Sequence, residues 1–205
     1  MPDTSLDGIT VLDLGQIYNG PYATMLMALA GARVIKVEPL TGETLRGRGD
    51  NSSAAYPFAM LNQNKESITL NLKTEQGKSM FRDLARTADV VVENFLPDTM
   101  AGLGIGADLL LARNPRLIYA AGSGYGRAGP HRDYLAMDIT VQAMSGVLGT
   151  TGTDELPPMK AGPAVCDFFG GVHLYAAVIT KLFERERTGR GGFIDVAMQD
   201  SVLPT

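Results

Sequence analysis

Cysteine and histidine are scarce in this sequence of 205 residues, which contains one cysteine, Cys166, and two histidines, His131 and His173. A single cysteine excludes an intrachain disulfide and a cysteine-rich zinc site. Two histidines leave little material for a histidine-based metal centre or a catalytic triad. His173, inside an apolar stretch, is more typical of a hydrogen-bonded core residue than of a ligand. We therefore expect a protein without a bound metal.

Positive charge is also in short supply. The 18 lysines and arginines against 22 aspartates and glutamates give a formal net charge of −4. This balance argues against the broad basic surface that nucleic-acid binding needs, so local groups must hold any anionic ligand. The polar start, MPDTSLDG, does not resemble a signal peptide, and we find no apolar run of membrane-spanning length. We expect a cytoplasmic protein with neither nucleic acid nor membrane as a partner.

Two phosphate-binding signatures are missing as well. No glycine-rich turn matches G-x-G-x-x-G between a strand and a helix, and no Walker A sequence is present. A dinucleotide site is therefore disfavoured. The chain shows no internal repeat and no low-complexity segment. Its composition, 45% hydrophobic and 20% charged, is ordinary for a globular protein and sufficient for a sizeable core.

Short apolar runs alternate with helical patterns along the chain. Strands are expected at residues 9–14, 33–37, 67–72, 89–92, 117–121 and 193–198, and helices at 22–30, 74–88, 109–112, 138–148 and 168–187. Residues 41–53 are polar, glycine-rich and expected to form a loop, and 200–205 resemble the start of another helix. Near-continuously apolar strands alternating with helices predict an α/β fold, with a Rossmann-like open, mainly parallel sheet and helices on both faces.

An open parallel sheet binds its ligands at the carboxyl ends of its strands. Four small or polar loops follow expected strands and are candidates for this site, at residues 15–20, 71–73, 94–96 and 122–126. Each of them is also compatible with an ordinary turn. Three cations near these loops are candidate phosphate ligands or, alternatively, solvated surface charges: Arg46, Arg48 and Lys73.

The most informative feature is Asp167, in the stretch KAGPAVCDFFGG at residues 160–171. This carboxylate follows an apolar step and opens an apolar helix, so it is partly desolvated and close to backbone N–H groups. Such an aspartate can cap a helix or attack an electrophile. Asp138 also begins an expected helix and has the same capping alternative. Taken alone, each residue leaves both interpretations open.

The order and spacing of nine motifs resemble the family III CoA-transferases. They are LDGITVLDL (6–14), GPYAT (20–24), GARVIKVE (31–38), NKESITLNLK (64–73), ADVVVENF (88–95), NPRLIY (114–119), QAMSG (142–146), KAGPAVCD (160–167) and TGRGGFIDVAMQD (188–200). The resemblance covers almost the whole chain. Through VAMQD it is closest to the branch that contains formyl-CoA transferase.

The resemblance implies that Asp167 is a catalytic nucleophile. It implies transfer of CoA between an acyl-CoA and a small carboxylic acid, through an aspartyl anhydride and an aspartyl-CoA thioester. With Arg46 added as a phosphate-binding cation, the expected contacts to CoA are Tyr18, Asn19, Arg46, Leu70, Asn71, Leu72, Lys73, Asn94, Phe95, Leu96, Met137 and Asp138.

The chain also departs from the family pattern. Pro39, Leu96 and Gly102 stand where relatives carry arginines, so Arg46 or Lys73 must supply more of the phosphate contacts. Family members are longer and form interlocked homodimers. We therefore interpret residues 1–205 as the N-terminal CoA-binding part of such an enzyme, inactive alone and lacking the second domain and the returning C-terminal segment.

Two alternatives remain open at this stage. One is a racemase or lyase of the same superfamily, acting on the acyl α-carbon. The racemase branch carries GHDINY, whereas residues 136–141 here read AMDITV and lack its histidine, which argues against a two-base racemase. The other is a CoA-binding module without catalytic activity. An assay of exchange between acyl-CoA and free acid separates these possibilities.

Overall fold

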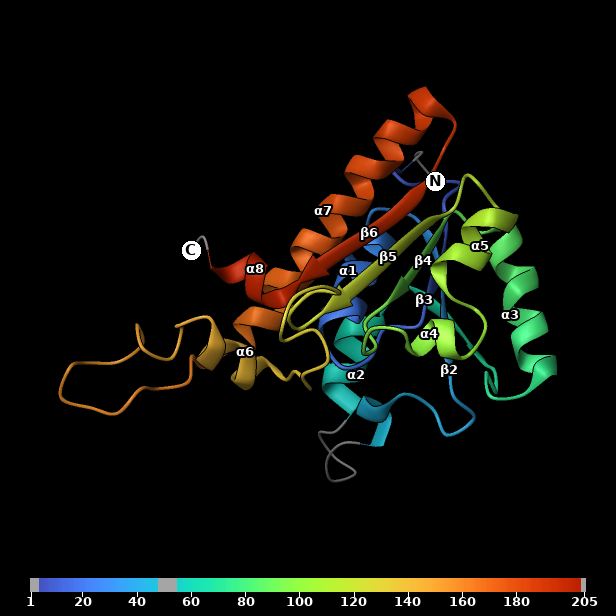
Figure 1. Ribbon diagram of the computed structural model, residues 1–205. Coiled ribbons are helices and arrows are strands. Elements are labelled where there is room, and N and C mark those ends of the chain that lie inside the picture. Colours follow the sequence, from blue (N-terminus) through green and yellow to red (C-terminus); the bar gives the residue numbers. More distant parts are fainter. Residues whose placement is uncertain (1–3, 48–54, 204–205) are drawn as a thin grey trace.

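The computed structural model describes residues 4–47 and 55–203. Within them, six strands form one sheet in which every pair is parallel, in the order β3-β2-β1-β4-β5-β6 (Figure 1). The strands are β1 (Thr10–Asp13), β2 (Arg33–Glu38), β3 (Lys65–Thr69), β4 (Val90–Glu93), β5 (Ile118–Ser123) and β6 (Gly192–Ala197). The predicted parallel sheet is confirmed. Its strand order reverses between β1 and β4, where such folds place their ligands.

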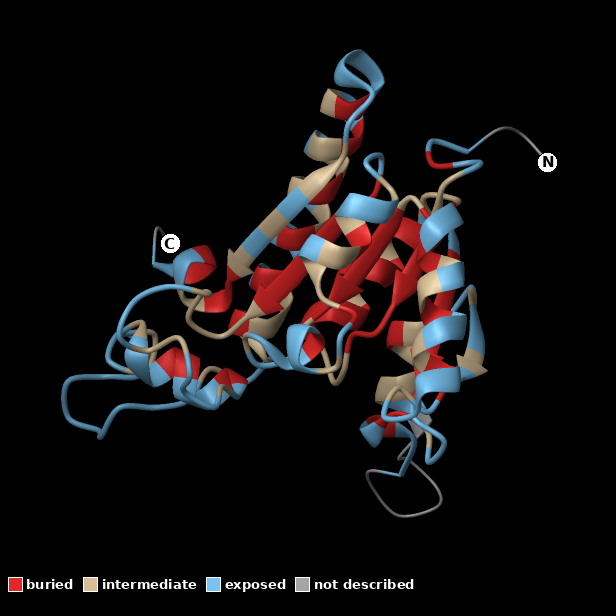
Figure 2. Ribbon diagram, turned by 45° about the vertical axis from the view of Figure 1, so that its right-hand side comes forward, coloured by how far each residue is buried: buried red, intermediate tan, exposed pale blue. Residues whose placement is uncertain are grey.

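Helices cover both faces of this sheet, because alternate residues of each strand point to opposite sides. On one face, Val91 packs with Phe81 of α3 (Glu75–Thr87) and with Leu110 of α5 (Ala107–Arg113). On the other face, Val90 and Val92 pack among residues of α1 (Asn19–Leu29) and α7 (Val165–Thr188). Figure 2 shows the central strands as the buried layer between them.

Two further helices extend the fold beyond the carboxyl edge of the sheet. These are α6 (Asp138–Met144) and α8 (Met198–Val202). They form a small core of their own with the start of α7, in which Val141, Cys166 and Met198 are buried together. This core brings the first turn of α6 beside the first turn of α7.

The largest differences from the predicted elements lie between residues 41 and 102. Part of the predicted loop at 41–53 forms the short helix η1 (Thr44–Gly47), while residues 48–53 lie outside the described part. The helices α2 (Ala55–Asn62) and α4 (Thr99–Gly102) were not predicted. Strand β3 begins two residues before the expected start, because it is a half-exposed edge strand without a continuous apolar run.

Helix α7 is long and apolar enough to cross a membrane, judged by length and composition alone. The prediction that no run reaches this length is therefore wrong by that criterion. In the structure, Leu174, Val178 and Leu182 of α7 are buried in the core cluster that covers one face of the sheet. This packing is that of a core helix in a globular fold.

Candidate functional site

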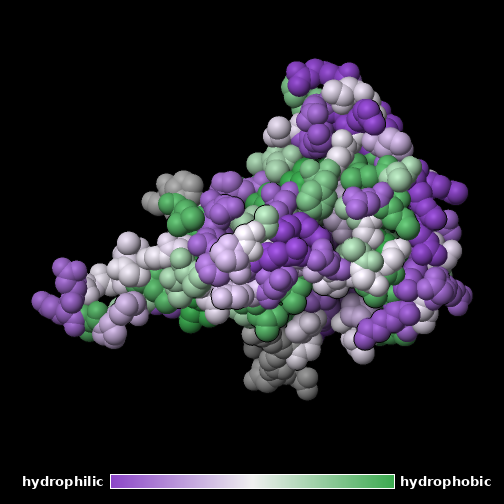
Figure 3. Space-filling model, viewed as in Figure 1, coloured by the Kyte–Doolittle hydropathy of each residue, from purple (hydrophilic) through white to green (hydrophobic). Residues whose placement is uncertain are grey.

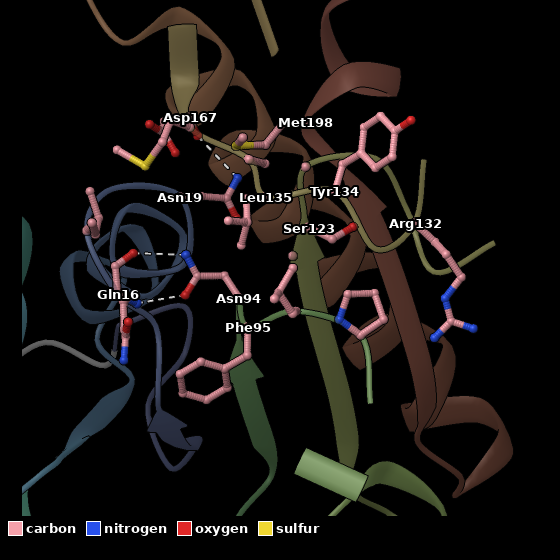
Figure 4. Close-up of a pocket in the computed structure, with 17 residues that line it drawn as sticks. Gln16, Asn19, Asn94, Phe95, Ser123, Arg132, Tyr134, Leu135, Asp167 and Met198 are labelled. Atoms are coloured by element: carbon pink, nitrogen blue, oxygen red, sulfur yellow. Dashed lines mark hydrogen bonds between the residues drawn. The ribbon is translucent and has the colours of Figure 1, made fainter. Parts of the chain in front are cut away.

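A cavity of about 200 Å³ lies at the point where the strand order reverses (Figure 4). Gln16, Asn94 and Ser123 reach it from the carboxyl ends of β1, β4 and β5, and Asp167 reaches it from α7. The predicted location at the strand ends thus matches the cavity. Asn19, Leu96 and Met137 also line it, as do Arg132, Tyr134 and Leu135, which the sequence did not single out.

Asp167 lies in the first turn of α7 and is not its cap. The helix begins three residues before the predicted start, with Ala164 at the N-cap position and no side-chain cap of its own. Asp138 of α6 supplies the missing acceptor. Its Oδ1 accepts hydrogen bonds from the backbone N–H groups of Cys166, at 2.8 Å, and Asp167, at 3.3 Å. Capping by Asp138 leaves the carboxylate of Asp167 facing the cavity.

The surroundings of Asp167 shift its carboxyl group toward the neutral form. Burial, together with the negative charge of Asp138, raises the pKa of Asp167 to about 7, although the backbone N–H of Asn19 lowers it. A desolvated carboxylate with this pKa is ionised in a substantial fraction of molecules at neutral pH. Such a group is suited to covalent or acid–base chemistry.

Asn19, the first residue of α1, packs against β5 and the start of α7. Its side-chain Nδ2 donates to the backbone oxygen of Asp167 at 3.3 Å (Figure 4), and the residue is 2% exposed. A Cβ atom on Gly122 or Gly170 would collide with the Asn19 amide, so both positions need glycine for this close approach. Within the described residues, Oδ1 of Asn19 has no hydrogen-bond partner.

Three polar side chains, two of them buried, hold the loop at residues 15–19. Nζ of Lys36 donates to the oxygen of Gly15 at 2.7 Å. The Asn94 amide accepts from the N–H of Gln16 and donates to its oxygen, at 2.7 and 2.9 Å (Figure 4). Glu43 accepts from the N–H of Ile17 at 2.9 Å. Ile17 has a φ of 63°, which is strained for a β-branched residue, so these bonds stabilise a costly turn.

A buried ion cluster adjoins the same loop, because Lys36, which binds the loop at Gly15, belongs to it. The Asp13 carboxylate is 2.9 Å from Nζ of Lys65 and 3.6 Å from Nζ of Lys36, and it accepts a hydrogen bond from Thr24 at 2.7 Å. Burial alone would raise the pKa of Asp13, but the two lysines and Thr24 hold it at about 2. The Asp13 carboxylate therefore stays ionised at neutral pH.

A second cavity, of about 600 Å³, adjoins the first and shares Gln16 and Phe95 with it. It lies at the carboxyl ends of β1, β2 and β3. Its walls contain five of the residues predicted to contact CoA: Leu70, Asn71, Leu72, Lys73 and Phe95. Lys73 is the one cation among its described lining residues. Pro39 and Gly102 also line it, at two of the three positions where relatives carry arginines.

Arg46 does not line any of the three cavities described here, so the structure does not support its predicted role as a phosphate ligand. Its guanidinium forms two hydrogen bonds with the Glu38 carboxylate, at 2.6 and 2.7 Å, and lies 3.9 Å from the ring centre of Phe58. The physical reason is that the buried Glu38 carboxylate needs a counter-charge. Arg48 lies outside the described residues.

Asn94 and Asp138 also use their side chains differently from the prediction. Both amide atoms of Asn94 bind Gln16, and the Asp138 carboxylate binds the start of α7. Both are positioned to shape the site through the backbone rather than to bind a ligand with these atoms. Within the described residues, no group of three or more histidine, cysteine, aspartate or glutamate side chains is arranged to hold a metal.

A third cavity, also of about 600 Å³, lies on the other side of Asp167. It shares Ile17, Met137 and Asp167 with the first cavity. Tyr18, predicted to contact CoA, lies in its wall beside Phe168, with ring centres 5.8 Å apart. The three cavities therefore follow one another in the order second, first, third, and Asp167 stands between the last two.

Comparison with known proteins identifies the family. Residues 6–205 match the model of CoA-transferase family III. The chain is 42% identical to an acetyl-CoA:oxalate CoA-transferase of Acetobacter aceti, over 98% of this chain and 53% of that protein. It is 43% identical to a formyl-CoA:oxalate CoA-transferase of Streptomyces avermitilis, over 97% of this chain and 49% of that protein.

Solved structures agree with the sequence match. A CAIB/BAIF family protein from Brucella suis superposes with a TM-score of 0.95 at 35% identity, over 99% of this chain and 55% of that one. The chain spans about half the length of the curated relatives it matches. Since the family model covers almost all of its residues, the chain belongs to CoA-transferase family III.

Proposed function

We propose that the complete protein moves CoA between an acyl-CoA and a free carboxylic acid, with Asp167 as the covalent carrier. The observation that carries this proposal is the position of Asp167, a partly buried carboxylate between two cavities at the switch point of the sheet. The names of relatives describe such transfers, among them acetyl-CoA to oxalate and a succinate–glutarate exchange.

In the proposed reaction, a carboxylate oxygen of Asp167 attacks the carbonyl carbon of the acyl-CoA thioester. The carbon–sulfur bond breaks, CoA leaves as a thiolate, and a mixed anhydride remains. The thiolate then attacks the side-chain carbonyl carbon of Asp167, which releases the first acid as a carboxylate and forms an aspartyl-CoA thioester. The acceptor carboxylate attacks this thioester, which expels the CoA thiolate and forms a second mixed anhydride. The thiolate then attacks the acceptor's carbonyl carbon, which gives the new acyl-CoA and frees the Asp167 carboxylate.

The site supports these steps by desolvation and fixed geometry. Burial removes water from the Asp167 carboxylate, which makes a weak nucleophile more reactive. The backbone N–H of Asn19 faces the Asp167 side chain and is placed to stabilise the negative charge that forms on its oxygen when the thiolate attacks its carbonyl carbon. Asp138 fixes the first turn of α7, so that Asp167 approaches the thioester in one orientation.

We place the nucleotide end of CoA in the second cavity, with its phosphates near Lys73, and the pantetheine arm in the first. The two cavities share Gln16 and Phe95, so one CoA molecule can extend through both of them to Asp167. The resemblance further leads us to propose that the complete protein is a homodimer. A cytoplasmic location remains a prediction.

The test is exchange of labelled carboxylic acid into acyl-CoA by the complete gene product. Asp167→Asn is expected to reduce exchange by on the order of 10³-fold or more, because the variant lacks the covalent carrier, while CoA binding persists. Hydroxylamine added during turnover should trap the aspartyl thioester and modify Asp167. Asp108→Asn, an exposed position on α5, is the matched control.

The same assay separates the alternatives. Wild-type exchange rates in Asp167→Asn would contradict the covalent mechanism. Loss of the α-proton of the acyl group without exchange would favour a racemase or lyase. CoA binding with neither reaction would favour a binding module.

A further inference from the structure

The third cavity has a defined place in the proposed reaction, and the inference that follows depends on that reaction. A thioester carbonyl carbon carries sulfur on one side and the acyl substituent on another. If CoA reaches Asp167 through the first cavity, the substituent must leave the reaction centre in a different direction. Asp167 is shared by the first and third cavities, so the third is the space open to the acyl group.

The walls of this cavity are mainly apolar. The Phe168 ring lies beside Tyr18 and makes an edge contact with Tyr22, with ring centres 5.8 and 4.8 Å apart. Tyr56 of α2 and Met137 also line the cavity and are 72% and 46% exposed. These side chains leave apolar surface uncovered in the cavity next to the nucleophile.

Two charged groups besides Asp167 line the cavity. The Asp138 carboxylate accepts hydrogen bonds from the start of α7. The Lys160 ammonium donates to the backbone oxygens of Ala161, at 2.9 Å, and Gly162, at 3.1 Å. Lys160 is the one cation among the described lining residues, so a negatively charged acyl group would have to draw it away from these oxygens and lose its own water among aromatic rings, which is unfavourable.

We propose that the third cavity selects apolar acyl groups longer than two carbons over formyl, acetyl and oxalyl groups. Tyr18, Tyr56, Met137 and Phe168 form the selective surface. Methionine adapts to different shapes, so chain length should matter more than branching. Each buried methylene adds about fourfold to the specificity constant, kcat/KM, until the cavity is filled.

The experiment measures kcat/KM of the complete protein with formyl-, acetyl-, butyryl-, hexanoyl-, oxalyl- and succinyl-CoA as donors. The expected result is a rise from acetyl to hexanoyl of about fourfold per methylene, with formyl and oxalyl below butyryl. Tyr56→Ser and Met137→Ser should each reduce the ratio of hexanoyl to acetyl. Met144→Ser, an exposed methionine on the same helix as Asp138 that lies outside the three cavities, should leave the ratio unchanged.

Two outcomes would overturn this proposal while leaving CoA transfer intact. One is a flat series, or one led by formyl- or oxalyl-CoA. The other is a preference for succinyl-CoA that Lys160→Ala removes, because Lys160 would then be the partner of a carboxylate.

If no donor supports exchange, the proposed transferase function fails first. Acyl-group selection can then still be measured by competition binding of acetyl- and hexanoyl-CoA to the complete protein. Equal affinities would reject the apolar site, and tighter binding of hexanoyl-CoA would support it.

Discussion

Asp138 and Asp167 lie 29 residues apart in the sequence and meet at the start of α7. Asp138 provides both a hydrogen-bond acceptor and a negative charge, and these two effects can be separated. Asp138→Asn keeps an acceptor but removes the charge that helps to raise the pKa of Asp167. We expect the pH profile of exchange in this variant to shift toward lower pH.

Asp138→Ala removes the acceptor as well. Loss of a helix cap costs on the order of 1–2 kcal/mol, so this variant should also be less stable to urea. Equal pH profiles of the wild type and Asp138→Asn would show that the charge of Asp138 does not act on Asp167.

The raised pKa of Asp167 also predicts a pH-dependent cost in stability. Below its ordinary pKa of 3.8, the side chain is protonated in both the folded and unfolded states and costs nothing. As pH rises toward about 7, the unfolded chain loses this proton more readily, so the folded state loses stability relative to it. Asp167→Asn has no such loss. Above pH 7 it should exceed the wild type in free energy of unfolding by on the order of 4 kcal/mol.

Urea unfolding of the complete protein at several pH values from 4 to 8 measures this difference. The gap should widen with rising pH and level off above 7. A gap that is constant with pH would mean that the carboxyl group of Asp167 keeps its ordinary pKa.

Lys73 is the residue expected to contact the CoA phosphates, whereas Arg46 is not. CoA should raise the melting temperature of the complete protein, because it binds the folded state. Lys73→Ala should weaken CoA binding by about fivefold, and by less at high salt, since the contact is electrostatic. Lys78→Ala, which removes a cation paired with Glu75, is the control.

Arg46→Ala should leave CoA affinity nearly unchanged. It should lower the stability of the free protein, because it leaves the buried Glu38 carboxylate without its counter-charge. The reverse pattern, normal affinity in Lys73→Ala and weak affinity in Arg46→Ala, would place the phosphates at Arg46 instead.

At the scale of elements, the site depends on the fit of Asn19 between β5 and α7. Gly122→Ala should cost about 1–3 kcal/mol, because its methyl group collides with the Asn19 amide. Asn19→Ala removes that amide, so the cost of Gly122→Ala should be much smaller in the Asn19→Ala background. Urea unfolding of the four proteins in this double-mutant cycle measures the coupling. Additive costs would show that the collision is relieved elsewhere.

Much of the sheet could be predicted from the sequence, because buried parallel strands are short, continuous apolar runs. The runs that contain Leu12, Val91 and Tyr119 became the central strands. The loops that follow them line the cavities, as the switch-point rule predicts. The local pattern of apolar residues was sufficient to predict those strands that are buried on both faces of the sheet.

Long-range polar partners were not predictable in the same way. The residue that caps α7 comes from α6, and the carboxylate that engages Arg46 comes from β2. Nothing in the local sequence around Asp167 or Arg46 indicates these partners. Helix α2 was missed because it follows a polar, glycine-rich stretch and contains Pro57, which favours a loop in a sequence reading.

At the scale of the molecule, α7 presents an apolar face to the outside as well as to the core. Phe169, Val172 and Phe183 are 43%, 42% and 67% exposed. Figure 3 shows hydrophobic residues at the surface over the middle of α7 and β6, while hydrophilic residues cover α3 and the upper tip of α7. Exposed apolar surface of this kind favours association.

We therefore expect the isolated 205-residue chain to self-associate and to show little exchange. The complete protein should be a homodimer with full activity. Light scattering and the exchange assay test both statements. A monomeric 205-residue chain that turns over acyl-CoA at about 1–10³ s⁻¹ would contradict them.

The order of the cavities along the chain has a consequence for synthesis on the ribosome. All lining residues of the second cavity lie between Leu14 and Leu103, whereas Asp167 follows more than sixty residues after Leu103. The chain segments that we assign to the nucleotide therefore emerge before the nucleophile does. Under these two proposals, the residues assigned to holding CoA are made before the residue assigned to reacting with it.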